Sequence, residues 1–428
     1  MSGAVPLHPR PIGTGPLDSG PAATDTRYVA YLVIVALAGW ALASYDLNLL
    51  VLALPAIAKD LGISEVRLGI LGFFVFGAQF LITLFAGYAM DRYGRRRVWM
   101  ICLAGTAVFT GLTAVVSGFW TLVLVRALAS GLAYSELAVS VTIVNEQVPA
   151  RGRGILYSVV QGGWPLGVFL ASGVYLAFGG LGWRPVFLFG ILPVLAVILG
   201  RLFIRESGRF EHERALHPDD AERITVRELF LEPGPVRRQL TLLSLCWIFY
   251  GISYVASNFY ITYWLTTYKG FSSEGASTLL LVSGGVGFLF YVAGGLLGER
   301  FGRREVLIGS ALAIPPLTVL FFFTASSAAT AIVYFLLYQA TNGTWSGAGY
   351  AYQGESFPTR IRGTAVGFLS AMGVLGFTLG SLLWILFSGF GNPALTWFTV
   401  ATAFSFGTWL TLLLRRIPPG LELEAIAR

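Results

Sequence analysis

Gly87-Tyr-Ala-Met-Asp91-Arg-Tyr-Gly94-Arg95-Arg96-Arg97 lies between two long apolar runs, and it recurs later as Gly295-Leu-Leu-Gly-Glu299-Arg-Phe-Gly302-Arg303-Arg304. The acid, the glycine after it and the first arginine recur at one common offset. Each stretch leaves an apolar run, turns at a glycine, which tolerates tight turns, and presents several guanidinium groups. Because such groups cannot lie in hydrocarbon, both turns belong on the same face of a membrane. The repeat therefore divides the chain into two similar halves.

The composition is that of an integral membrane protein. The chain has 428 residues, of which 55% are hydrophobic and only 12% are charged, and its mean hydropathy is +0.72. Soluble chains carry charges on about a quarter of their residues. A membrane helix needs roughly 20 apolar residues. We find twelve such runs, at residues 28–56, 66–90, 98–117, 119–143, 154–178, 184–204, 239–267, 276–298, 305–325, 328–352, 363–388 and 394–414. The sequence predicts an all-α membrane fold with six helices in each half.

These runs divide the chain into a disordered tail at 1–27, a first half at 28–204, a linker at 205–238, a second half at 239–416 and a tail at 417–428. We expect no cleavable signal peptide, because the first segment is rich in proline and lacks an apolar core. An even number of spans puts both termini on one face, which also holds most of the 29 lysine and arginine residues. This asymmetry predicts cytoplasmic termini and a location in the cell membrane. It accounts for the pI near 9.5 without a nucleic-acid partner.

A second repeat supports the duplication. Glu146-Gln-Val-Pro149-Ala-Arg-Gly-Arg153-Gly154 matches Glu355-Ser-Phe-Pro358-Thr-Arg-Ile-Arg362-Gly363, and both copies fall on the predicted cytoplasmic face. Two six-helix halves that follow one another in parallel are the build of the major facilitator fold. From residue 28 to residue 416, the chain resembles a member of the major facilitator superfamily.

The resemblance implies roles for both repeats. In that family the first motif joins helices two and three, and its acid, here Asp91, belongs to a cytoplasmic charge network that stabilises one conformation and breaks in the other. The other network positions fall on Glu146, Arg153, Glu355 and Arg362, and the turns contribute Gly87, Gly94, Arg95, Glu299, Gly302 and Arg303. The alternative is that these charges only set the topology and cap helix ends.

A narrower resemblance involves helices one and four. Arg126, Glu136 and Glu146 are spaced ten and ten, which is similar to proton-coupled carboxylate symporters of the sialate/lactate and aromatic-acid type. The stretch from Trp40 to Asp46 resembles their helix-one motif of two acids, although its first acid is replaced here, so that only Asp46 remains. Sugar porters also place an acid in helix one and an arginine in helix four, so the pair alone does not choose a substrate.

Asp46 and Arg126 lie at similar depth in their helices, so we expect them to meet. A charge inside a membrane is costly when it is alone, by about 2.5–3.5 kcal/mol. The pair is either structural or a proton switch, in which Arg126 is drawn to an anionic substrate and grips its carboxylate with two parallel hydrogen bonds. Asp46 then takes a proton. Glu136 is either a second proton station or an acid at the inner rim of helix four.

Polar and aromatic residues recur at helical spacing in several runs, which predicts either a substrate cavity or aromatic packing. Tyr250, Tyr254 and Asn258 share one face of their run, and Tyr338, Asn342 and Trp345 share another. Gln161 and Trp164 add a pair on helix five. The two asparagines favour a cavity, because a buried amide needs partners.

Several functions are excluded. Neither lysine follows a glycine, so there is no phosphate-binding loop for ATP, and no His-Glu-x-x-His motif predicts a metalloprotease. We expect no enzyme activity and no cofactor other than a coupling proton. The leading hypothesis is a proton-coupled symporter that moves a small organic anion across the lipid bilayer by alternating access. The alternatives are a sugar, polyol or drug carrier working by facilitation or proton antiport, and a nutrient sensor that binds without transporting.

Overall fold

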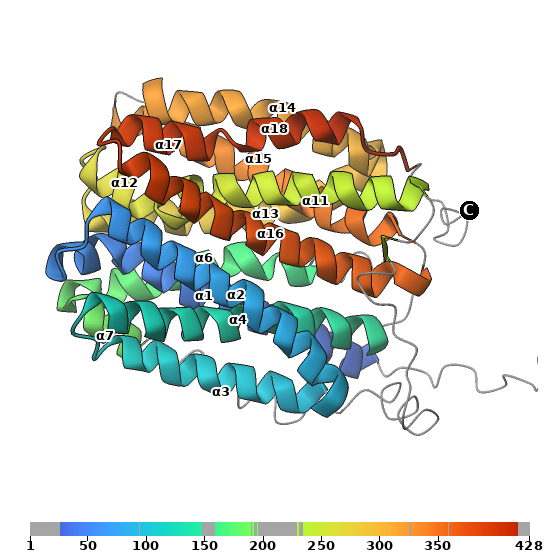
Figure 1. Ribbon diagram of the computed structural model, residues 1–428, viewed down its shortest axis with the longest axis horizontal. Coiled ribbons are helices and arrows are strands. Elements are labelled where there is room, and N and C mark those ends of the chain that lie inside the picture. The colour runs from blue at the N-terminus through green and yellow to red at the C-terminus, as the bar shows by residue number, and fades with distance from the viewer. Residues whose placement is uncertain are drawn as a thin grey trace, which may run out of the picture.

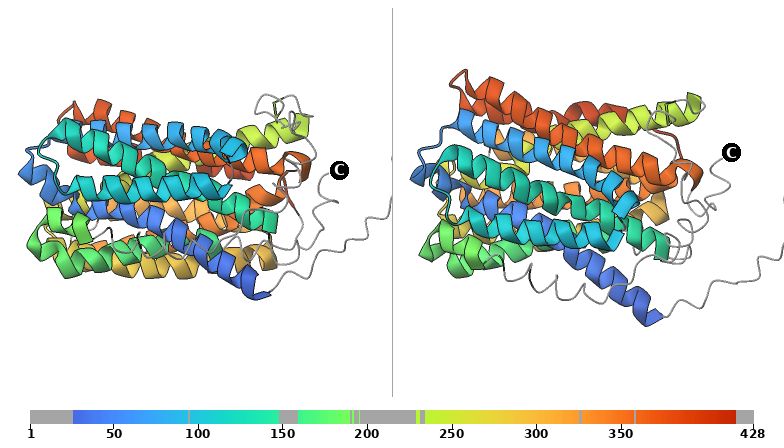
Figure 2. Two further views of the ribbon diagram at one scale, coloured as in Figure 1. Left: turned by 90° about the horizontal axis from the view of Figure 1, so that it is seen from below. Right: turned by 60° about the horizontal axis from the view of Figure 1, so that its bottom comes forward.

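The computed structural model describes residues 26–93, 95–147, 159–189, 234–324, 327–357 and 359–417, together with residues 191, 195, 229 and 230. All regular elements in these ranges are helices, and seven helical stretches are long and apolar enough to cross a membrane. Figure 2 shows the helices running side by side along the long axis. The fold is therefore of the predicted all-α membrane class.

The two halves repeat one pattern of helix packing. The first half contains α1 (Thr26–Asp60), α2 (Glu65–Tyr93), α3 (Arg95–Thr113), α4 (Phe119–Gln147), α6 (Gly163–Phe178) and α7 (Trp183–Phe189). The second half contains α11 (Gly234–Tyr254), α12 (Ile261–Thr267), α13 (Ser273–Phe301), α14 (Arg303–Val319), α15 (Ala328–Glu355), α16 (Thr359–Ser388), α17 (Pro393–Ala401) and α18 (Phe404–Leu412). In the first half α1 packs on α6 and α2 on α4, and in the second α11 packs on α16 and α13 on α15. The halves meet where α2 packs on α16 and α6 on α13 (Figure 1).

The second copy of the turn motif shows why a glycine stands there. Gly302 ends α13 and begins α14 with a φ of 99°, a backbone conformation that side chains with a Cβ rarely adopt. Its counterpart Gly94 lies outside the described residues, between the end of α2 and the start of α3. The side chains of Asp91 and Arg95, next to that position, also lie outside the description.

Within the described residues, the predicted runs at 239–267, 305–325 and 394–414 are not continuous α-helices. The run at 239–267 consists of α11, a π-helical turn, η2 (Val255–Phe259), and α12. The run at 305–325 contains Pro315 and Pro316 inside α14 and ends in a second π-helical turn, η3 (Leu320–Thr324). The run at 394–414 is divided into α17 and α18. Pro315 and Pro316 lack the N–H group that a continuous helix uses, so they interrupt the hydrogen-bond ladder inside α14.

At the end of the molecule where α1 passes into α2, hydrogen bonds join the two halves. We call this set of contacts the seal. The donors are side chains of the second half, and the acceptors lie on α1 and α2: Thr262 to the carbonyl of Val51, Tyr260 to the carbonyl of Leu68 at 2.6 Å, Trp384 to the carbonyl of Glu65 at 3.2 Å, and Tyr268 to the carboxylate of Glu65. The halves are therefore closed against each other at this end.

One bond of the seal depends on a proline. The carbonyl of Val51 would normally accept the N–H of the residue four positions later in α1, but that residue is Pro55, which has no N–H. Val51 is nearly fully buried, so its carbonyl needs another donor. The hydroxyl of Thr262 provides it from the other half.

At the opposite end, the segment 413–417 after α18 is held across the second half, and we call this segment the strap. The Tyr352 hydroxyl donates to the main-chain carbonyl of Arg415 at 2.6 Å, and the main-chain N–H of Arg415 donates to the side chain of Gln239 at 3.3 Å. Gln239 also donates to the Tyr352 hydroxyl at 2.5 Å. Leu414 and Ile417 are buried beside these bonds, so the strap ties the start of α11 to the end of α15.

Candidate functional site

A buried ion pair lies inside the first half. Nη2 of Arg126 (α4) is 2.8 Å from Oδ2 of Asp46 (α1), and Nη1 donates to Oδ1 at 3.1 Å. Both side chains are 0% exposed. Nη2 also donates to the main-chain carbonyl of Asp46 at 3.1 Å, and the hydroxyl of Thr110 (α3) donates to Oδ1 at 2.5 Å. The expected contact between the two charges is therefore present, and its role as a proton switch stays a prediction.

The surroundings of the pair hold Arg126 firmly in place. Its guanidinium lies 5.4 Å from the ring centre of Phe187 (α7), and Ser130 approaches Nη2 at 3.4 Å. Two parallel charge-assisted hydrogen bonds to Asp46 are the strongest geometry available to a guanidinium. Only Nε of Arg126 has no hydrogen-bond partner among the described residues. Breaking the pair would leave a buried charge, so it opens only if another charge change compensates.

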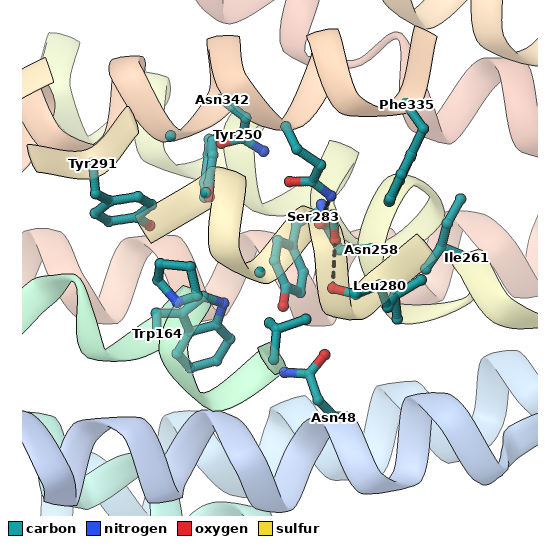
Figure 3. Close-up of a pocket in the computed structure, with 17 residues that line it drawn as sticks. Asn48, Trp164, Tyr250, Asn258, Ile261, Leu280, Ser283, Tyr291, Phe335 and Asn342 are labelled. Atoms are coloured by element: carbon teal, nitrogen blue, oxygen red, sulfur yellow. Dashed lines mark hydrogen bonds between the residues drawn. The ribbon is translucent and has the colours of Figure 1, made fainter. Parts of the chain in front are cut away.

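A cavity of about 50 Å³ lies between the halves, with walls from α1, α6, α11, η2, α12, α13 and α15 (Figure 3). Five residues predicted for a substrate cavity line it: Trp164, Tyr250, Tyr254, Asn258 and Asn342. A single water needs about 10–15 Å³, so this volume admits only a few waters. The site must widen to take up a substrate.

Four residues predicted for the cavity do not line it. Arg126 is held behind α1 by Asp46. The Tyr338 hydroxyl donates to Ser257 at 2.8 Å, one layer behind the wall. Trp345 stacks on Tyr250, with the ring centres 5.0 Å apart and the planes at 13°. Gln161 is buried just before the start of α6. The structure therefore places five of the nine predicted residues on the cavity wall and four elsewhere.

Four polar lining residues were missed: Asn48, Ser283, Tyr291 and Gln339. A signal for Gln339 was present, because Phe335, Gln339 and Asn342 stand at positions i, i+4 and i+7 of one run, and all three line the cavity. Asn48 follows Asp46 by two residues on α1, where the charge of Asp46 is the stronger signal. Ser283 and Tyr291 lie on α13, which offered no polar pattern.

The polar wall of the cavity is one connected hydrogen-bond chain. Nε2 of Gln339 donates to Oδ1 of Asn258 at 2.9 Å, and Nδ2 of Asn258 donates to Oγ of Ser257 at 3.2 Å. Ser257 also accepts from Tyr338, and Asn342 lies within 3.5 Å of the Tyr338 hydroxyl. Asn258 and Ser257 both belong to the π-helical turn η2, a feature that is frequent at functional sites. The turn directs consecutive polar residues toward α15.

The charge network of the second half lies among the described residues, at the end of the molecule that holds the strap. Arg303, of the repeated turn, donates from Nε and Nη2 to the two carboxylate oxygens of Glu355, each at 2.6 Å, and Glu299 lies at 3.9 Å. The network therefore joins the two repeated motifs. The side chains of Glu136, Glu146 and Arg362, and all of Arg153, lie outside the described residues, as does any contact of Asp91. The helical backbone at Gly87 belongs to α2.

Comparison with known sequences identifies the family. The sequence model of the Major Facilitator Superfamily matches residues 36–294, and the model described as "Sugar (and other) transporter" matches residues 211–415. The chain belongs to the Major Facilitator Superfamily, a family of transporters and not of enzymes.

Individual relatives and a solved structure agree with this assignment. The cis,cis-muconate transport protein of Acinetobacter baylyi is 28% identical over 77% of this chain and 81% of its own length. The sialic acid transporter NanX of Escherichia coli is 25% identical over 86% of this chain and 89% of its own. The crystal structure of a D-xylose-proton symporter superimposes with a TM-score of 0.73 at 19% identity, covering 92% of this chain and 98% of that one. At that identity, the superposition shows a shared fold alone.

Proposed function

We propose that this protein is a proton-coupled symporter for a small organic anion. The observation that carries the proposal is the Asp46–Arg126 pair, which is fully buried in the first half next to a cavity between the halves. Ionisable groups inside membrane helices mark ion and substrate pathways. The names of the muconate and sialic acid relatives, both transporters of acids, support an organic anion as the substrate.

We infer from the positive-inside asymmetry that the seal faces the outside of the cell and that the strap, the charge networks and both termini face the cytoplasm. The structure then has its extracellular end closed. Tyr250 lines the central cavity and also a smaller hollow of about 20 Å³ that includes Tyr134 and Trp247. It therefore stands on the route from the site to the cytoplasm. Alternating access requires the seal to open while the cytoplasmic networks close.

Proton and anion are coupled because the pair is electrically neutral only while Asp46 is ionised. Proton uptake by Asp46 leaves the charge of Arg126 unbalanced, and a bound anion restores the balance. The loaded carrier then carries almost no extra charge for a monovalent acid and one proton. Binding of the proton alone, or of the anion alone, leaves an uncompensated charge in a low-dielectric interior. That charge disfavours the conformational change of the carrier.

A sugar carrier is the second candidate. The amide-rich cavity wall favours it, and the fold shared with the D-xylose-proton symporter is compatible with it. The deciding experiment is uptake by proteoliposomes containing the purified protein, tested with cis,cis-muconate, benzoate, xylose and a cationic dye, with and without an imposed pH gradient. Gradient-driven accumulation of an acid supports the proposal. Transport of xylose at full rate, with no acid transported or competing, would replace it by the sugar carrier.

A further inference from the structure

The cavity wall holds no charged side chain among its lining residues. Its polar groups are amides, hydroxyls and the edges of aromatic rings, contributed by Asn48, Asn258, Gln339, Asn342, Ser283, Tyr250, Tyr254 and Tyr291. The guanidinium of Arg126 is absent from this wall, because both of its terminal nitrogens are bound to Asp46 on the far side of α1. A substrate in this cavity therefore meets neutral hydrogen-bond donors.

We infer that the carboxylate of the substrate is bound by the amide groups of Gln339 and Asn258, and that Arg126 supplies its charge from behind the wall without touching the substrate. This inference rests on the proposed transport of an organic anion. It assigns the binding contact to different residues from those that handle the proton.

The Gln339–Asn258 pair has the right geometry for an acceptor-only ligand. Each amide nitrogen carries two N–H groups. Within the described residues, Gln339 donates a hydrogen bond to Asn258 at 2.9 Å, and Asn258 donates one to Ser257 at 3.2 Å. One N–H of Gln339 is left for a ligand, whereas the Asn258 amide also interacts with the Tyr338 hydroxyl, which a ligand must replace there. Because the first bond joins the two amides, their nitrogens lie close together, as two donors to one carboxylate must. The bond of Asn258 to Ser257 fixes the orientation of its amide within η2.

The opposite wall is suited to a flat apolar group. Trp164 and Tyr254 line the cavity, with their ring centres 6.2 Å apart, and Pro165 and Val168 continue the surface along α6. Figure 3 shows Trp164 on the side of the cavity opposite Asn342. A conjugated or aromatic acid would place its flat body against Trp164 and its carboxylate toward Gln339 and Asn258. The substrate class is therefore a flat, unsaturated carboxylic acid.

The charge of Arg126 reaches the site through α1. Asp46 and Asn48 stand two residues apart on that helix, and Asn48 lines the cavity while Asp46 faces Arg126. When Asp46 takes a proton, the positive charge is separated from the cavity only by the thickness of one helix, in a medium that screens it weakly. The affinity for the anion therefore rises as the pH is lowered, although no protein cation contacts it.

The test compares matched variants in binding of radiolabelled benzoate and cis,cis-muconate to the purified full-length protein, with benzamide as a neutral competitor. Gln339→Met removes the donors at similar volume, and Gln339→Glu replaces them with acceptors. Both are expected to lower acid affinity by about tenfold to a hundredfold, the effect of losing a hydrogen bond to a charged group. Competition by benzamide should change by less than about threefold. Thr341→Val, on α15 outside the cavity lining, is the control and should bind as the parent does.

Arg126→Lys tests whether the carboxylate of the substrate contacts Arg126 or only the amides of Gln339 and Asn258. It keeps the charge and loses the planar fork, so acid affinity should fall less in Arg126→Lys than in either Gln339 variant, because only the Gln339 variants remove a contact with the substrate. Loss of acid binding in Arg126→Lys, with parent affinity in both Gln339 variants, would overturn the inference and return the carboxylate to Arg126. If the parent protein binds neither acid but binds xylose, the proposed function itself fails. Monodisperse elution of each variant confirms that the comparison concerns folded protein.

Discussion

Asp46 accepts three strong hydrogen bonds, one from Thr110 and two from the Arg126 guanidinium, and it has no contact with water in this state. Asp46→Asn keeps the volume of the side chain and cannot exchange a proton. We expect accumulation driven by a pH gradient to be lost, while exchange of labelled for unlabelled substrate remains measurable. Proteoliposome uptake and counterflow measure the two activities.

The control for Asp46→Asn is Asp60→Asn, at the end of the same helix. Asp60 pairs with Arg184 at 2.7 Å, but both side chains are about half exposed, at 45% and 40%. An exposed pair contributes little, so this variant should transport as the parent does. Gradient-driven uptake at the parent rate in Asp46→Asn would remove Asp46 from the coupling mechanism.

At the scale of single residues, the sequence predicted the partners and not their surroundings. Asp46 and Arg126 stand out because charges are rare in membrane helices, and their depths could be compared by counting residues. That Arg126 turns away from the cavity depends on Thr110 and Phe187, which come from helices whose packing leaves no pattern in the sequence. Helical spacing could have predicted Gln339 as a lining residue. Its amide lies between Tyr338 and Trp345, whose aromatic side chains gave the stronger signal.

The bond between Thr262 and the freed carbonyl of Val51 links two elements of opposite halves. Thr262→Val removes the donor and leaves a buried carbonyl without a partner, which costs about 1–3 kcal/mol in the sealed state only. We expect the equilibrium to shift toward the state that is open at this end. A cysteine introduced by Ser381→Cys, fully buried between α16 and α2, should then react faster with a membrane-impermeant thiol reagent.

Pro55→Ala tests the same bond from the other side. Alanine restores an N–H to the helix, so the Val51 carbonyl gains a partner within α1 and no longer depends on Thr262. Thr262→Val should therefore have a smaller effect on thiol reactivity in the Pro55→Ala background, whereas Thr262→Ser, which keeps the hydroxyl, should resemble the parent. Equal effects of Thr262→Val in both backgrounds would show that the proline does not create the contact.

At the scale of elements, apolar length located the helices and failed at their interruptions. The π-helical turn η2 arises inside a continuous apolar window, and nothing in hydropathy distinguishes it from an ordinary turn. Its partners explain it, because Ser257 and Asn258 are both engaged by α15. The two prolines of α14 were a visible signal of an irregular helix, and the prediction of a simple span there ignored it.

The Arg303–Glu355 pair maintains the second half as one body. Its side chains are only 12% and 27% exposed, and both hydrogen bonds are short, so Glu355→Gln should lower the free energy of unfolding by about 1–3 kcal/mol. The apparent melting temperature of the purified protein measures this change. Glu305→Gln is the control, because its partner Arg416 is 74% exposed and the pair should contribute almost nothing. If the melting temperature is unchanged in both variants, the charge network does not stabilise the fold and its charges only set the membrane topology.

At the scale of the whole molecule, the two halves could be predicted because their motifs recur at a common offset and on one face. The conformation could not, since an alternating-access protein uses the same sequence for every state. The seal shows why. Its acceptors include the main-chain carbonyls of Val51, Glu65 and Leu68, and a main-chain contact leaves no pattern of side chains in the sequence.

The strap limits which substitutions the protein can tolerate at residue 415 during evolution. Both bonds at residue 415 use main-chain atoms, and the side chain of Arg415 is exposed. Almost any amino acid placed there would preserve the attachment, so this position is free to drift. Proline is the exception, because it lacks the N–H that binds Gln239. A segment that looks like a variable tail thus excludes one residue type, for a reason that no side chain reveals.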